Sequence, residues 1–186
     1  MLLDIKFLDD ATRPEPPVLE DITDEQRLPG QHLVMIHNHL RENMKTLERL
    51  IERAAAGVAS PAQVAEETEE LTMVSNYRRF GNLCGQHCQF VHTHHSIEDY
   101  AIFPELGRQG EIYRRIAERL KAEHEVIHEV LIRLVDALET LAREPSRTNF
   151  EAAREVYTAL ERVLLSHLGY EEAAMGDALG YFGIGA

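Results

Sequence analysis

The sequence predicts an all-α protein that folds as an up-down-up-down four-helix bundle preceded by an extended N-terminal arm. Four long segments carry apolar residues at alternating steps of three and four, which is the period of an amphipathic helix. The 186 residues include only 11 glycines and 7 prolines, and alanine, leucine, glutamate and arginine, all good helix formers, are abundant. No segment shows the apolar-polar alternation that is typical of a β-strand.

The positions of proline and glycine divide the chain. Residues 1–29 are acidic and contain four prolines, so we expect an extended arm that packs along the domain. Residues 30–180 form the expected bundle, and residues 181–186 form a short glycine-rich tail. The expected helices span about 31–56, 72–102, 112–143 and 150–179, and the stretch 62–71 is either a short separate helix or the lead-in to the second long one.

Helix ends are predicted from the same residue types. Gly57 and Gly180 should end the first and the fourth helix. Ser60 followed by Pro61 is typical of a helix cap with proline at the first helical position. Pro104 disfavours a helical conformation at the residue before it, so the second helix should end near residue 102.

Composition and charge narrow the class of protein. A hydrophobic content of 44% and a charged content of 27% are ordinary for a globular domain, and a net charge of −13 argues against a nucleic-acid or anionic-membrane partner. No apolar run approaches the length of a membrane span, and the first residues lack the pattern of a signal peptide. We therefore expect a cytoplasmic protein in which Cys84 and Cys88 are free thiols.

Each of the four apolar stripes is interrupted by residues that bind metals. These are His37 in the first helix, His94 and Glu98 in the second, His124 and His128 in the third, and His167 and Glu171 in the fourth. Residues four apart on a helix are rotated by only about 40°, so each pair leaves the same face. A buried carboxylate needs a cation or strong donors, and these stripes place no lysine or arginine close to either glutamate. Seven ligands are too many for one zinc ion and suit two transition-metal ions bridged by carboxylates.

Other side chains offer competing ligand sets. His95 and Asp99 are also four residues apart, but that register lies about 100° from the apolar stripe. A zinc site made by the second helix alone would crowd four ligands onto one rod, which does not close a tetrahedron; these are Cys84, His87, Cys88 and His92. His87 lies about 10 Å along the axis from His94, so it either lines a ligand channel or is a hydrogen-bonded core histidine, which we favour.

The four motifs, in this order on four helices, resemble the hemerythrin family. The matching stretches are residues 37–41, residues 94–99 running on to Phe103 and Pro104, residues 123–128 and residues 166–172. The resemblance covers about residues 30–180 and implies a hemerythrin-like bundle with a non-haem di-iron site.

The resemblance also implies a role for each ligand. One iron would be held by His124, His128 and His167, and the other by His37 and His94. Glu98 and Glu171 would bridge the two irons together with a solvent-derived oxo or hydroxo group. Oxygen-carrying members often have an aspartate five residues after the last histidine; here the residue at that position is Glu172, and the helical period favours Glu171 as the bridge.

Three functions follow as hypotheses. The first is a di-iron protein that binds O2, peroxide or NO at the iron with two imidazoles, for oxygen binding or for oxidative or nitrosative detoxification. The second is an iron- or oxygen-sensing module that acts through a protein partner. The third is a structural bundle without a metal. The sequence leaves open whether the protein is an enzyme; we expect a small diatomic or peroxide ligand and neither nucleic acid nor membrane as partner.

Overall fold

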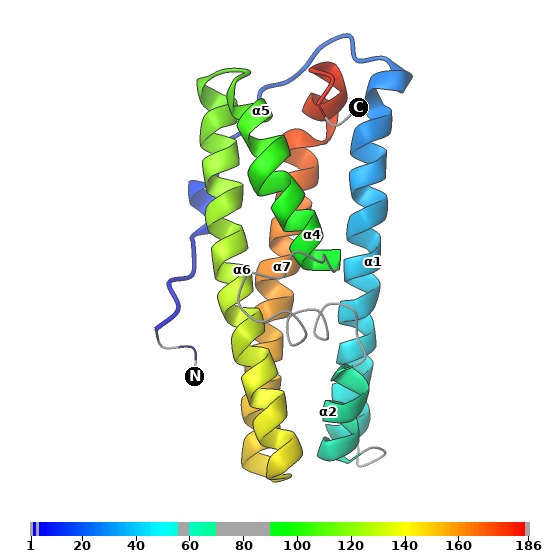
Figure 1. Cartoon of the computed structure of the whole chain (residues 1–186), viewed down its shortest axis with the longest axis vertical. Helices are drawn as coiled ribbons and strands as arrows, with labels where there is room; N and C mark the ends of the chain where they lie inside the picture. The colour runs from blue at the N-terminus through cyan, green and yellow to red at the C-terminus, as the bar shows by residue number, and fades with distance from the viewer. Residues whose placement is uncertain (1, 3, 56–59, 70–89, 185–186) are drawn as a thin grey trace.

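The computed structural model describes residue 2 and residues 4–55, 60–69 and 90–184, and these ranges contain helices and no strand. Four rods run alternately down and up the long axis (Figure 1). They are α1 (Asp24–Ala55), the continuous rod of α4 (Phe90–Ile97), η2 (Glu98–Ile102) and α5 (Phe103–Gly107), then α6 (Glu111–Arg143) and α7 (Arg147–Tyr181). Helix α7 packs against both α1 and α6. The predicted all-α bundle is confirmed.

Helix α1 begins seven residues before the expected position. The side chains of Thr23 and Gln26 each accept a hydrogen bond from the other's backbone N–H, at 3.2 and 2.9 Å. This reciprocal capping box starts the helix ahead of Pro29, which lies inside α1. The proline cluster therefore marks the arm only up to the cap, and a Thr-x-x-Gln pattern was the signal for the helix start.

The second expected helix is described only from residue 90 onward. Helix α2 (Pro61–Glu69) is a separate element, and Ser60 and Gln63 cap it as Thr23 and Gln26 cap α1. The expectations for Cys84, Cys88 and His87 fall outside the described residues.

The rod that carries His94 does not end before Pro104, contrary to expectation. Residues Glu98–Ile102 form a π-helical turn, in which the N–H of Phe103 bonds to the carbonyl of Glu98. The helix then continues as α5, with Pro104 in its first turn, where a missing N–H leaves no helical bond unmade. Such wide turns often occur at functional sites, and this one begins at a predicted ligand.

Helix α7 ends at Tyr181, one residue beyond the glycine that was expected to end it. A Cβ atom at Gly180 would clash with the backbone carbonyl of Gln26 in α1, and one at Gly30 would lie 2.5 Å from the carbonyl oxygen of Gly176. Glycine is thus required here by the close approach of α1 and α7, and not by a change in backbone direction.

The apolar core is divided into two layers by a polar level. On α1, Leu33 belongs to one apolar cluster and Leu40 to the other. On α6 the corresponding residues are Leu120 and Ile127, and α7 shows the same pattern. Between these layers lie His37 on α1, His124 on α6 and Glu171 on α7, so the fold encloses polar groups at mid-height and covers them on both sides.

Candidate metal centre

Seven buried histidine and glutamate side chains from all four rods meet at the polar level. They are His37, His94, His95, Glu98, His124, His167 and Glu171, and none exceeds 8% exposure. They form two groups whose ligand atoms lie within 4.8 Å of one another: His95, His124 and His167 in the first, and His37, His94, Glu98 and Glu171 in the second. Burying this many polar groups without compensation would strongly destabilise the fold.

Three of the histidines are oriented by carboxylates. The Nδ1 atom of His37 lies 2.8 Å from Glu172, that of His124 lies 3.0 Å from Asp99, and that of His167 lies 3.0 Å from Glu123. An ionised carboxylate can only accept, so in each pair the Nδ1–H donates, and a neutral ring then carries its lone pair on Nε2. Nδ1 held by an acid with Nε2 turned inward is the usual arrangement of a metal-binding histidine.

The inward-facing atoms have no hydrogen-bond partner within the described part of the chain. These atoms are Nε2 of His95, His124 and His167 and both carboxylate oxygens of Glu98 and Glu171. Buried polar atoms are almost always hydrogen-bonded in native proteins, so seven such atoms in one place need a common explanation. Imidazole and carboxylate donors that converge on one point fit transition-metal ions.

Each glutamate of the second group also lies close to a histidine of the first. Oε2 of Glu171 is 3.1 Å from Nε2 of His167 in the first group and 3.5 Å from Nε2 of His37 in the second. Glu98 has one oxygen 3.1 Å from His94 and the other 3.6 Å from His124. Both carboxylates thus reach imidazoles on either side, as a bridge between two adjacent ions would.

A comparison with models of protein families matches residues 28–179 to the hemerythrin HHE cation-binding domain. The chain belongs to the hemerythrin HHE family. The match covers the bundle from the second turn of α1 almost to the end of α7, so the predicted family and its four-helix fold are both confirmed. Comparisons with curated proteins and with solved structures gave no match. No helix in the described ranges is long and apolar enough to cross a membrane.

The hemerythrin domain brings together six of the seven predicted ligands. The seventh, His128, is half-buried and lies outside both groups, with its Nε2 2.8 Å from Nδ1 of His95. His95 takes the place in the first group and stacks on His124, with ring centroids 3.8 Å apart. Glu171 lies in the second group, whereas Glu172 lies outside it and holds His37.

His94 and His95 belong to the two competing registers of the second rod, and both lie in the ligand groups. Adjacent residues on a helix point about 100° apart. In the bundle, His94 faces His37 on α1, and His95 faces His124 and His128 on α6. Asp99, the partner of His95 in the rival register, lies outside both groups and accepts a hydrogen bond from Nδ1 of His124.

Burial and charge keep most of these imidazoles neutral. Burial lowers the pKa of His37 and His124, takes that of His94 to about 3, and places that of His95 well below its usual value. His167 is different: burial alone would lower its pKa, but its hydrogen bond to Glu123 and the nearby charge of Glu171 raise it to about 9. Neutral imidazoles are the form that binds metals.

Burial likewise separates the two glutamates. It raises the pKa of Glu98 well above its usual value, helped by the nearby charge of Glu171. Glu171 itself has a lowered pKa, because its contact with His167 outweighs burial. In the metal-free protein the pair therefore holds one negative charge, because two ionised carboxylates in one buried pocket would repel each other without a cation.

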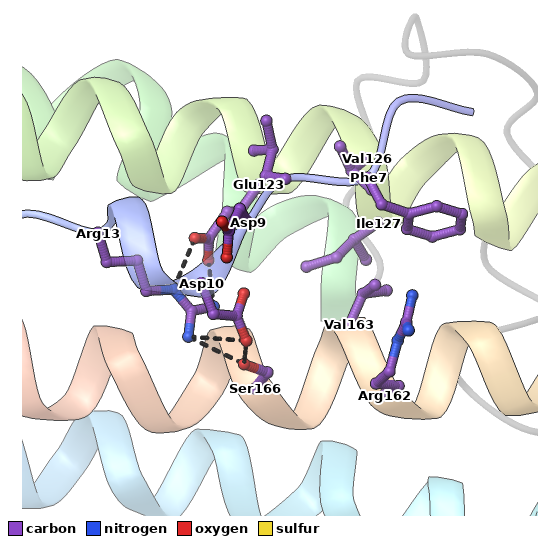
Figure 2. A pocket seen from close by; sticks show the side chains of 11 residues that line it. Phe7, Asp9, Asp10, Arg13, Glu123, Val126, Ile127, Arg162, Val163 and Ser166 are labelled. Carbon is purple, nitrogen blue, oxygen red and sulfur yellow. Dashed lines mark hydrogen bonds and ion pairs between the residues drawn. The ribbon is translucent and has the colours of Figure 1, made fainter. Parts of the chain in front are cut away.

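The N-terminal arm is linked to the candidate centre through Glu123, the acid that orients His167. Figure 2 shows Arg13 of the arm lying over α6 and α7, beside Glu123 and Ser166. Arg13 donates to both oxygens of Glu123, at 2.9 and 3.0 Å, and Arg119 adds a third bond at 2.6 Å. Burial would raise the pKa of Glu123, but donors from His167, Arg13 and Arg119 lower it to about 2. Arg13 of the arm thus helps to keep Glu123 ionised, and Glu123 in turn orients His167.

Replacing Arg13 by methionine should lower the free energy of unfolding by about 2–4 kcal/mol, because Glu123 stays buried with one guanidinium fewer. The side chains of Arg13 and Glu123 are only 14% and 7% exposed. The matched control is Arg27→Met, which removes an arginine whose pair with Asp177 is 46% and 53% exposed, and which should cost no more than about 0.5 kcal/mol. Urea unfolding measures both, and equal effects would contradict a structural role for the arm.

Proposed function

We propose that this hemerythrin domain holds two iron ions and uses them to bind O2, peroxide or NO, in oxygen binding or in oxidative or nitrosative detoxification. The observation that carries the proposal is the set of inward-facing Nε2 and carboxylate atoms without a hydrogen-bond partner in the described ranges. When bound, a pair of irons supplies reversible electron transfer to such small ligands. The family match supports a cation site, and the donor set of imidazoles and carboxylates suits iron.

The chain's own residues fix where the ions would sit. We assign His95, His124 and His167 to one ion, His37 and His94 to the other, and Glu98 and Glu171 to both. The second ion then has one imidazole fewer, which leaves it the more open of the two to a small ligand. Asp99, Glu123 and Glu172 hold the Nδ1 protons of three histidines, so these rings are pre-set in orientation and tautomer.

The test removes a bridge without disturbing the bundle. Glu98→Leu replaces a buried carboxyl group by an apolar group of similar size. We expect iron content to fall from about two ions per chain to one or none, and the absorption of the air-exposed, iron-loaded protein and its response to NO and peroxide to be lost. The metal-free variant should be at least as stable as the metal-free parent, because an uncompensated buried polar group is gone.

The control is His39→Gln, an exposed histidine on α1 two residues from a proposed ligand, which should keep both irons and the spectrum. Full iron content in Glu98→Leu, or a parent protein that takes up no iron, would refute the proposal. Peroxide consumption in the presence of a reductant then separates detoxification from binding or sensing, since a sensor would give reversible spectra without turnover.

A further inference from the structure

A large cavity opens beside the second group of ligands. It has a volume of about 1010 Å³ and lies between the first turns of α1, the rod α4–η2–α5 and the C-terminal residues that follow α7. Figure 1 shows these three segments at the same end of the bundle. His94 and Glu98 are part of its wall, so the cavity leads directly to the proposed metal centre.

Most of the wall is apolar, and its polar residues lie at the rim and at the inner end. Leu33, Leu179 and Ile184 are buried lining residues, while His32, Glu105 and Gln109 are exposed. Two large apolar side chains, Leu28 and Ile97, line the cavity and are 57% and 51% exposed. The described lining residues include two glutamates and neither lysine nor arginine. Such a wall favours a neutral apolar molecule and disfavours an anion.

The size of the cavity exceeds what a diatomic ligand needs. A water-sized molecule occupies about 30 Å³, so O2, NO or hydrogen peroxide would fill only a small part of the space. The cavity instead has the dimensions of a site for an organic molecule. Its inner end at His94 and Glu98 is the polar part, which selects an oxygen-bearing group at one end of an apolar body.

We propose that this cavity binds a neutral organic molecule with a long apolar chain and a terminal alcohol or hydroperoxide group, and that it orients that group toward His94 and Glu98. The placement deepens the proposed function, because it names the class of organic molecule that would reach the more open ion. Binding itself needs only the cavity wall, so it is testable with and without iron.

The experiment titrates 1-hexanol, 1-octanol and 1-decanol into the full chain, both iron-loaded and metal-free, and follows binding by calorimetry near neutral pH. We expect one saturable site, with affinity rising by about fourfold for each added methylene group. Sodium decanoate, which has the same chain length as decanol but is charged, should bind at least tenfold more weakly. Binding by the metal-free protein makes failure of this inference distinguishable from failure of the iron proposal.

Two substitutions narrow the cavity at different points. Ile36→Trp on α1 and Ala101→Trp in η2 should each weaken decanol binding tenfold or more. Leu165→Trp on α7 is the matched control, a partly exposed apolar residue outside the cavity wall, and should leave binding unchanged. Circular dichroism identifies a variant that fails to fold, and the test then rests on the other cavity variant. Absence of saturable binding, equal binding of decanoate, or unchanged binding in a folded cavity variant would each overturn the inference.

Discussion

The metal-free protein is expected to lose stability as the pH is lowered from 7 to about 5. Burial lowers the pKa of four histidines, so they stay neutral in the folded bundle, while in the unfolded chain they take up protons below their ordinary pKa of 6.5; they are His37, His94, His95 and His124. The stability that these four histidines contribute is therefore complete above 6.5 and is lost as the pH falls toward the lowered values. Far-UV circular dichroism with urea unfolding at stepped pH measures the loss.

The size of the effect follows from counting protons. His167, with its pKa raised to about 9, is protonated in both states below 6.5 and contributes nothing in this window. Glu98 has a raised pKa, so it keeps a proton in the folded state and releases it on unfolding above about 4.5, which offsets one of the four. His94 and His95 contribute one proton each and His37 and His124 up to one each, so unfolding takes up a net one to three protons at the lower end of the window, which gives a slope of about 1.4–4 kcal/mol per pH unit. A typical domain has only about 5–15 kcal/mol of stability to lose.

A single substitution checks this count. His94→Leu should reduce the slope by about one proton, or about 1.4 kcal/mol per pH unit, whereas His39→Gln on the exposed face should leave it unchanged. Iron loading should move the transition to lower pH, because the bound ions compete with protons for the same nitrogens. A free energy of unfolding that stays level between pH 7 and 5 would contradict the burial of neutral imidazoles.

His95→Phe is expected to remove iron from the first group, while His128→Gln is expected to keep it. Phenylalanine preserves the stacking of ring 95 on His124 but supplies no nitrogen. If Nε2 of His95 binds the metal, its Nδ1–H donates to Nε2 of His128, and the amide oxygen of glutamine can accept that bond instead. Iron analysis and cobalt(II) absorption report occupancy of the group.

His128→Ala completes the series. Loss of a residue that only positions a ligand typically weakens metal binding by about 10–100-fold, so the alanine variant should bind iron more weakly and the glutamine variant should recover most of the loss. The ligand set implied by family resemblance makes the opposite prediction. If His128→Gln loses iron and His95→Phe keeps it, then His128 is the ligand and His95 is its neighbour in the pocket.

The ligand-bearing faces of α1, α6 and α7 could be read from the sequence because helical periodicity is local. His37, His124, His167 and Glu171 fall where apolar residues were due, and every one of them is buried at the polar level. The same period placed the start of α6 within one residue. Cap residues that were overlooked, such as Thr23 with Gln26, account for the early start of α1.

Two of the three acids that orient histidines occupy the same position relative to a glutamate of the cluster. Asp99 and Glu172 each come directly after a glutamate of the cluster, and each accepts a hydrogen bond from a histidine on a neighbouring rod. A residue one step further along a helix is rotated by about 100°, which turns it from the centre toward a neighbouring helix. Whether that neighbour presents an imidazole there depends on the axial alignment of the two rods.

By itself, the sequence determined the family, the helical class and the level at which the polar residues interrupt the core, because these depend on spacing along single helices. Tertiary structure alone decided that His95 and not His128 lies in the first group, that Arg13 reaches Glu123, and that a cavity opens beside Glu98. Each of these depends on how far one rod is shifted and rotated against another. That offset is set by packing, such as the close approach of α1 and α7 at their glycines, and no local pattern records it.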